Sequence, residues 1–145
     1  TECIWSKSGE SLEFFVSDAG VLSTINEFKE SDKISMPGNT NTRIKNGKIV
    51  SVKTISLNEL IINLFKSKSP SYISVDTEGS EYEIMKEFDF KNFRPIVFTI
   101  EHNFTETQAK IDKLLTSNDY VRVLSGVTAF DGWYITDEFY KLLNK

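Results

Sequence analysis

The chain has 145 residues, of which 39% are hydrophobic and 26% charged, and its net charge is -4. This composition is enough for one folded domain over residues 1–145, and it argues against a disordered chain or a broad basic face for nucleic acid. The lone Cys3 excludes an internal disulfide, and no Cys/His cluster suggests structural zinc, so we expect a reducing, cytoplasmic location. The sequence contains no stretch of about 18 apolar residues, so we expect no membrane-spanning helix.

The first predicted elements are two strands. Residues 1–5 are apolar enough for a short buried strand, and residues 11–17 alternate between apolar and polar. The polar turn signal at 7–10 predicts that these strands form a hairpin. From 18 to 48 no periodic pattern is present, and we expect a flexible loop over 26–48, which is either a disordered excursion or a substrate lid.

After residue 48, apolar strands alternate with amphipathic helices. Strands are expected at 49–55, 71–76, 95–101, 120–126 and 132–138, and helices at 57–66, 80–88, 106–118 and 138–145. Capping-box patterns begin the helices near Ser56 and Thr105. This alternation predicts an α/β fold with a mainly parallel sheet. About six residues separate the last two strands, too few for a parallel crossover, so these strands should form an antiparallel hairpin.

Acidic residues follow two of these strands. Asp76 and Glu78 come after the strand at 71–76, where free N–H groups of a helix start would also explain them as simple caps. Gly79 permits a tight turn or a close approach of a ligand. Glu101, His102 and Asn103 follow the strand at 95–101. Neighbouring parallel strand ends lie about 5 Å apart, so these groups together suit general-base work or a hard divalent cation.

These residues also carry a family resemblance. The stretch "ISVDTEGSEYEIMKEFDF" contains Asp-x-Glu-Gly-x-Glu at Asp76, Glu78, Gly79 and Glu81, and "PIVFTIEHN" and "DGWYI" follow it. The chain thereby resembles the carboxy-terminal part of the FkbM-family S-adenosylmethionine-dependent methyltransferases. The segments "ECIWSKSGESLEFFVSD" and "SVKTISLNELI" are similar to earlier parts of that family, so the resemblance covers most of the chain except about 26–48.

The resemblance implies an O-methyltransferase whose cofactor is S-adenosylmethionine and whose acceptor is a hydroxyl of a sugar or another natural product. The residues it places at the catalytic point are Asp76, Glu78, Glu101 and His102. Those it places at the cofactor are Asp76, Ile4 and Trp5. Those it places at the acceptor are Asn103, Asp131 and Trp133, although the last two are equally typical of a hairpin turn and a core residue. No metal is expected; a weaker alternative is a divalent cation on Asp76, Glu101 and Asn103.

The resemblance further implies a partial Rossmann-like sheet. The family sheet has seven mostly parallel strands in the order 3-2-1-4-5-7-6, and this chain would supply strands 3 to 7. The Gly-rich turn and the ribose-binding acid of the family are not in this sequence. We therefore expect a carboxy-terminal portion of a larger enzyme, with an open edge at strand 4. The expected partners are a small-molecule or glycan acceptor and, at that edge, a second copy or the missing amino-terminal part. The alternative is a non-catalytic fragment or interaction domain.

Overall fold

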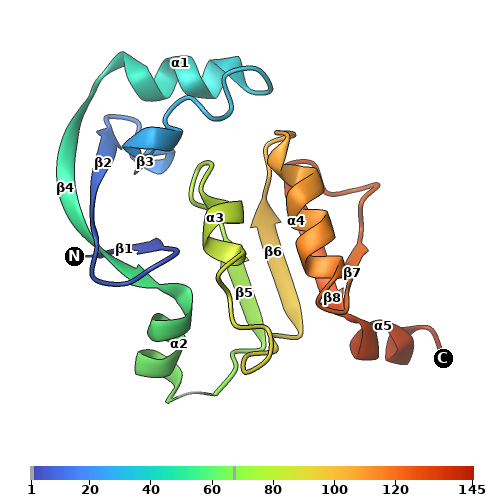
Figure 1. Cartoon of the computed structure of the whole chain (residues 1–145). Helices are drawn as coiled ribbons and strands as arrows, with labels where there is room; N and C mark the ends of the chain where they lie inside the picture. Colours follow the sequence, from blue (N-terminus) through green and yellow to red (C-terminus); the bar gives the residue numbers. More distant parts are fainter. Residues whose placement is uncertain (1, 67) are drawn as a thin grey trace.

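The computed structural model describes residues 2–66 and 68–145, which form two four-stranded sheets with helices around them (Figure 1). The strands are β1 Glu2–Trp5, β2 Ser11–Ser17, β3 Thr24–Ile25, β4 Gly47–Ser56, β5 Tyr72–Val75, β6 Val97–Glu101, β7 Tyr120–Val123 and β8 Asp131–Thr136. The α-helices are α1 Pro37–Lys45, α2 Leu57–Phe65, α3 Glu81–Met85, α4 Thr107–Thr116 and α5 Asp137–Leu143. Two short 3-10 turns, η1 Gly20–Leu22 and η2 Asn26–Phe28, flank β3. Within the described part of the chain, no helix is long and apolar enough to cross a bilayer.

Sheet A, with the order β1-β4-β2-β3, is organised by the long curved strand β4 (Figure 1). The first residues of β4 pair with β2 in antiparallel fashion, and its last four, 53–56, pair with β1 in parallel. Because β4 lies between β1 and β2, the hairpin predicted around 7–10 is wrong. Residues 7–10 do form a turn, but the two strands that it connects form their backbone hydrogen bonds with a third strand instead of with each other.

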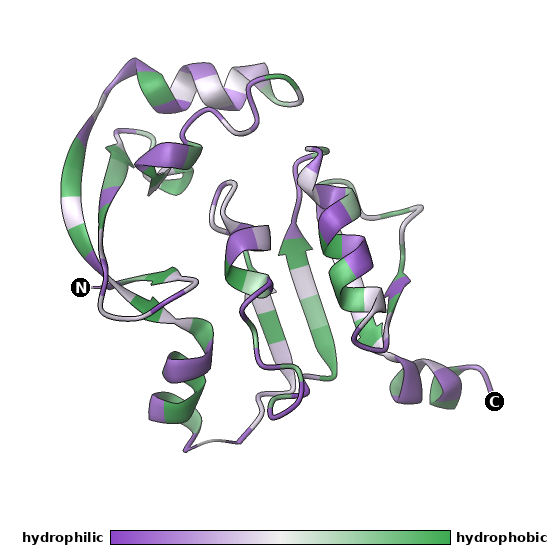
Figure 2. Cartoon of the chain, viewed as in Figure 1, coloured by the Kyte–Doolittle hydropathy of each residue, from purple (hydrophilic) through white to green (hydrophobic). Residues whose placement is uncertain are grey.

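Sheet B, with the order β5-β6-β8-β7, carries the main apolar core. Its strands β5 and β6 are parallel, whereas β8 is antiparallel to both β6 and β7. Helices α3 and α4 supply the buried residues Met85, Ile111 and Leu115 to this core, and Phe98 and Ile100 of β6 are fully buried beneath them. Figure 2 shows the hydrophobic residues gathered along the strands. The predicted antiparallel hairpin of the last two strands is confirmed.

The prediction of one mostly parallel Rossmann-like sheet is wrong. The chain forms two mixed sheets, and in the curled sheet A strand β2 pairs with β4 in antiparallel fashion over seven residues. The expected strand order is observed only in sheet B. Its strands β5, β6, β8 and β7 correspond, in that spatial order, to the strands expected as 4, 5, 7 and 6. Alternating strands such as β2 are typical of a sheet with one solvated face, and antiparallel sheets meet that condition more easily than parallel ones.

The segment predicted as a loop over 26–48 contains regular secondary structure. It contains η2, helix α1 and the start of β4. Helix α1 begins with Pro37, a residue that is well suited to the first turn because it needs no intrahelical partner for a backbone N–H. Its buried residues are Thr40 and Arg43, both polar, so the helix lacks the apolar stripe that a periodicity argument needs.

The helices after β4 begin in two different ways. Ser56 caps α2 by accepting a hydrogen bond from the Glu59 backbone N–H, as its capping-box pattern predicts. The capping box predicted at 105–108 does not form: the N-cap residue of α4 is Glu106, without a side-chain cap hydrogen bond, and the Thr105 hydroxyl donates to the His102 carbonyl. This contact ties the start of α4 to the end of β6, which is the edge of the sheet where the acidic residues lie.

Candidate active site

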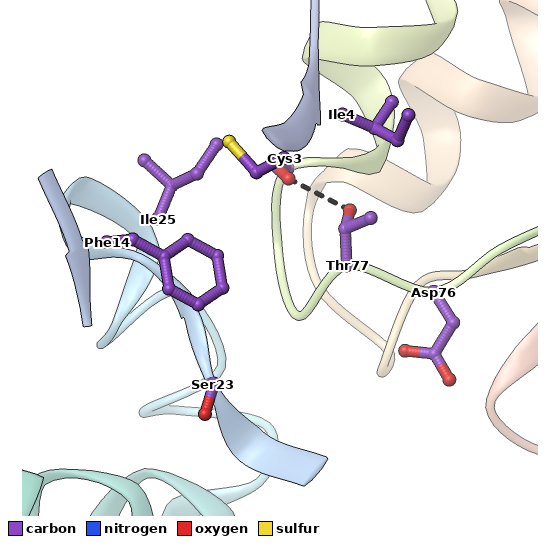
Figure 3. A pocket seen from close by; sticks show the side chains of 8 residues that line it. Cys3, Ile4, Phe14, Ser23, Ile25, Asp76 and Thr77 are labelled. Carbon is purple, nitrogen blue, oxygen red and sulfur yellow. Dashed lines mark hydrogen bonds between the residues drawn. The ribbon is translucent and has the colours of Figure 1, made fainter. Parts of the chain in front are cut away.

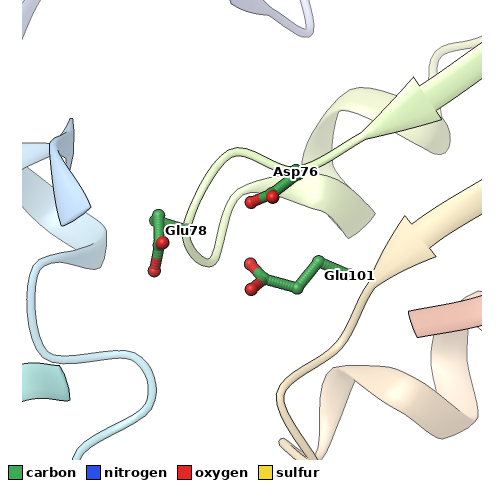
Figure 4. Close-up of side chains that lie close together, drawn as sticks. All are labelled: Asp76, Glu78 and Glu101. Carbon is green, nitrogen blue, oxygen red and sulfur yellow. The ribbon is translucent and has the colours of Figure 1, made fainter. Parts of the chain in front are cut away.

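Three carboxylates meet at the ends of β5 and β6 (Figure 4). Asp76 follows β5, Glu78 lies in the turn after it, and Glu101 ends β6. One carboxylate oxygen from each residue lies within 4.8 Å of the others. Val75 pairs with Ile100 in the parallel register, and this pairing brings the two strand ends to the same edge. The expected meeting of these acidic strand ends is therefore observed.

The turn that carries Asp76 and Glu78 is held by Glu81. The buried Glu81 carboxylate accepts hydrogen bonds from the backbone N–H groups of Thr77, at 2.8 Å, and Gly79, at 3.0 Å. Gly79 has a φ of +115°, and a side chain here would collide with Ser31. These N–H groups belong to the turn before α3, and the N-cap residue of that helix, Ser80, makes no side-chain cap hydrogen bond. The capping role considered for Asp76 and Glu78 is therefore not observed, and Asp76 is exposed at the site.

Glu78 is bound from the other side by Arg43 of helix α1. The Arg43 Nη2 donates to Glu78 Oε2 at 2.5 Å, and the same guanidinium pairs with the buried Asp32 at 2.7 Å. Glu78 itself has a left-handed φ of +59°, a conformation that costs energy for a residue with a Cβ. Contacts from sheet A and its helix therefore define where this carboxylate lies.

The cluster changes the acidity of its members. Burial, followed by the negative charges of Asp76 and Glu78, raises the pKa of Glu101 to about 8. The Oε2 atom of Glu101 is buried and has no hydrogen-bond partner among the described residues. Burial also raises the pKa of Glu78, and the Arg43 charge opposes that rise. Burial and the neighbouring charges thus bring the pKa of Glu101 close to neutral pH.

A cavity of about 210 Å³ adjoins the cluster, between the two sheets (Figure 3). Ile4, Phe14 and Ile25 line its apolar side, and Asp76 and Thr77 line the other. Ile4 and Asp76, two of the residues expected at the cofactor, therefore line different sides of the same cavity. Trp5 instead packs against Phe28, with ring centroids 5.9 Å apart.

The structure does not bring His102 into the carboxylate cluster. Glu101 and His102 are consecutive, and successive side chains of an extended chain point to opposite faces. The His102 Nδ1 accepts from the Phe104 backbone N–H at 3.1 Å, and its Nε2 lies 3.3 Å from Arg122 Nη2. Burial and the Arg122 charge lower the pKa of His102. The imidazole thus belongs to the packing between β6, β7 and α4.

The residues expected at the acceptor lie at different distances from the cluster. Asp131 is the register partner of Glu101 across β6 and β8, so the two share a sheet face. Asn103 is buried just beyond Glu101, with a φ of +43°. Trp133 shares the face of Glu101 but lines a separate cavity with Val97, Ile135 and Tyr140. Asp131 and Asn103 therefore flank the site, whereas Trp133 lies further along the strand.

Sequence reasoning missed the residues that hold the cluster from sheet A. Arg43, Asp32 and Thr24 are each at most 2% exposed, although all three fall in the segment without a periodic pattern. Pro37 at the start of α1 and basic residues in its last turn were usable signals for the helix itself. No signal in the sequence pairs Arg43 with Glu78, because 35 positions separate them.

In this α/β protein, carboxylates lie at the carboxyl ends of adjacent parallel strands. Enzymes of this class bind their ligands at that edge of the sheet. Comparison with known families then gives a more specific result. The chain belongs to the Methyltransferase FkbM domain family, which it matches over residues 3–122. No curated protein and no solved structure matched the chain. The protein is accordingly a methyltransferase-family domain, as the resemblance in its motifs predicts.

The cavity beside Asp76 fits part of S-adenosylmethionine, the cofactor usual for methyltransferases. The Asp76 carboxylate complements a cationic sulfonium, and Ile4 and Phe14 offer apolar contact. The cavity volume of about 210 Å³ is smaller than the roughly 300–1,000 Å³ of sites that enclose drug-sized ligands. The residues present therefore suit the sulfonium of the cofactor and not the whole molecule.

Proposed function

We propose that this protein is an S-adenosylmethionine-dependent O-methyltransferase that acts on a hydroxyl of a sugar or another natural product. The observation that carries the proposal is the meeting of Asp76, Glu78 and Glu101 within 4.8 Å at one strand edge. Membership in the FkbM methyltransferase family supports methyl transfer as the reaction. The carboxylates would form the acceptor side of the site, next to the cavity that contains Asp76.

The chemistry assigns different roles to the carboxylates. An alcohol is a weak nucleophile at neutral pH, so a positioned base assists its attack. Glu101 would take the proton of the acceptor hydroxyl while the hydroxyl oxygen attacks the methyl group. Asp76, exposed at the end of β5, would orient the acceptor by accepting a hydrogen bond from a second hydroxyl of the sugar or polyol. Bound S-adenosylmethionine would supply the methyl group from its sulfonium, the C–S bond breaking as the C–O bond forms.

The pKa of Glu101 supports its assignment as the base. A general base is most effective when its pKa lies near the working pH. The value of about 8 follows from burial and from the neighbouring acids, which together disfavour the ionised form. Glu78 is less suited to the role, because its carboxylate is already bound by Arg43.

The direct test is transfer of a tritium-labelled methyl group from S-adenosylmethionine to a panel of monosaccharides and polyols. Glu101→Gln should lower the rate about 10²- to 10⁴-fold, the range for loss of a general base. Asp76→Asn should also lower it, while Glu87→Gln, an exposed acid beyond α3, serves as the matched control. His102→Gln should change the rate little, because its contacts are with Arg122 and Phe104. Full activity of both Glu101→Gln and Asp76→Asn would refute the proposal.

A second candidate is metal-assisted methyl transfer, which the spacing of the three carboxylates favours. The oxygens offered are those of Asp76, Glu78 and Glu101, a different set from the one containing Asn103 that the sequence suggested. Hard divalent cations prefer six or more oxygen ligands, of which carboxylates supply the charged ones. Exhaustive chelation distinguishes the two mechanisms: activity that disappears and returns with Mg²⁺ would favour the metal, and unchanged activity would end this candidate.

A further inference from the structure

Arg43 is fully buried, with 0% of its surface exposed, and all five N–H groups of its guanidinium have acceptors. Its Nε donates to the Leu22 carbonyl at 2.8 Å, and its Nη1 donates to the Lys29 carbonyl at 3.1 Å. The remaining donors go to Asp32 and Glu78. An arginine so completely bonded cannot rotate without breaking several contacts, so it is a fixed point in this part of the fold.

The two acidic partners of Arg43 differ in their surroundings. Asp32 is 2% exposed and also accepts a hydrogen bond from Thr40 at 2.7 Å, so it belongs to the interior of the α1 region. Glu78 lies in the turn after β5, a strand that belongs to the other sheet. The planar guanidinium therefore bridges an internal anchor to a residue of the candidate site, and its fixed fork sets the direction of the second bond.

The same region also holds the backbone of the turn. The buried Thr24 hydroxyl lies 3.1 Å from both the Thr77 and Glu78 carbonyl oxygens. Ser31 packs against Gly79 so closely that only glycine fits there. The left-handed conformation of Glu78 is thus kept by contacts from sheet A and from the segment that leads to α1.

We propose that Arg43 is a positioning residue of the candidate site: by binding the Glu78 carboxylate, it fixes the turn that presents Asp76 to Glu101. The inference rests on the proposed function, since it assigns Arg43 a part in methyl transfer. Arg43 itself contacts neither acceptor nor cofactor. It occupies Glu78 and leaves Asp76 and Glu101 as the carboxylates that meet the acceptor.

A mutant cycle of Arg43 with Glu78 separates positioning from general stability. With the sugar and polyol panel, Arg43→Met should lower kcat up to about 10²-fold, the loss expected from a displaced reacting group, and leave the KM for S-adenosylmethionine unchanged. Arg43→Lys keeps the charge and should restore part of the rate. In the Glu78→Gln background, Arg43→Met should add little, because contacting residues that act together are not additive.

Thr54→Val is the matched control for loss of stability. Thr54 is buried in sheet A and donates to the Lys7 carbonyl at 2.7 Å, with no bond to Arg43 or to the turn. This variant should reduce stability while leaving kcat within about twofold of wild type. An equal loss of kcat in Thr54→Val and Arg43→Met, or losses of Arg43→Met and Glu78→Gln that multiply, would overturn the positioning role.

Amide hydrogen exchange gives a readout that needs no turnover and no Arg43→Met variant. The Thr77 and Gly79 amides, both bonded to Glu81, should exchange at least about tenfold faster in Arg43→Lys while the β6 amides keep their rates. Unchanged exchange at the turn overturns the inference whatever the activity shows. If no acceptor is methylated but the turn amides respond as expected, the proposed function fails and the placement of the turn by Arg43 stands.

Discussion

Sheet B packs on α3 and α4 through apolar side chains, whereas the junction of sheet A with the carboxylate turn is held by buried polar groups. In the first region, Phe98 is fully buried and lies edge-on to Phe88 and Tyr120, with ring centroids 5.4 and 5.2 Å apart. In the second, Arg43 and Asp32 are buried as an ion pair. Apolar burial is non-directional, while a guanidinium fork fixes angles as well as distances. The difference suggests that sheet B supplies stability and the junction supplies the geometry of the site.

The largest effect should come from the apolar region. Phe98→Ala removes the ring at the centre of the aromatic cluster and should lower the free energy of unfolding by about 3 to 5 kcal/mol. Chemical denaturation measures it, with Phe104→Ala, a half-exposed ring outside this core, as the control. A loss for Phe98→Ala no greater than that of the control would contradict the division of roles between the two regions.

Breaking the polar junction should cost somewhat less stability. Arg43→Met leaves Asp32 buried without its partner and should lower the free energy of unfolding by about 3 kcal/mol. Adding Asp32→Asn removes the uncompensated charge and should restore part of that loss. Both values come from the same denaturation experiment. If the double variant were less stable than Arg43→Met alone, the unpaired carboxylate would not be the source of the cost.

The pH dependence of stability tests Glu101. Its pKa rises from about 4.5 in the unfolded chain to about 8 in the folded protein, so the folded state binds the extra proton in this window. The contribution of the protonated Glu101 to the free energy of unfolding is fully present below pH 4.5 and is lost as the pH rises toward 8. Glu101→Gln should flatten this decline and gain about 1 to 2 kcal/mol at pH 8, a value discounted because the carboxyl is partly exposed. A decline of unchanged slope in the variant would argue against the raised pKa.

The smallest effect is expected at Thr24. Thr24→Val removes the hydroxyl shared by the Thr77 and Glu78 carbonyls and should cost about 1 kcal/mol, the net value of one hydrogen bond. Thr42→Val, on the exposed face of α1, should be nearly neutral. Thermal unfolding of the two variants side by side checks the difference. Equal melting temperatures would show that the Thr24 contact does not stabilise the junction.

The same division explains what the sequence could predict. Apolar strands and amphipathic helices gave β5, β6, α2 and α4 close to their observed positions, because periodic apolar burial is visible in the sequence. The convergence of Asp76 with Glu101 followed from the parallel order of two such strands. The site's carboxylates were therefore predictable from local patterns and elementary sheet geometry.

The parts that could not be predicted depend on contacts between distant segments. Strand β4 lies between β1 and β2, an order that neither strand's pattern specifies. Arg43 is a polar residue in a polar segment, and its burial becomes favourable only after Asp32 and Glu78 are in place. His102 illustrates the converse, since its position next to Glu101 in sequence directs it to the other face of the sheet.

The measurement that tests the account most directly is the pH profile of methyl transfer to a sugar or polyol acceptor. If Glu101 is the base, kcat/KM of the wild type should rise with pH, about tenfold per unit, and level off near pH 8. Glu101→Gln should remove this rise and leave a low, flat profile, while Glu87→Gln should reproduce the wild-type curve. A profile in Glu101→Gln that keeps both the wild-type midpoint and the wild-type plateau would contradict the assignment of the carboxylate cluster as the acceptor side of the site.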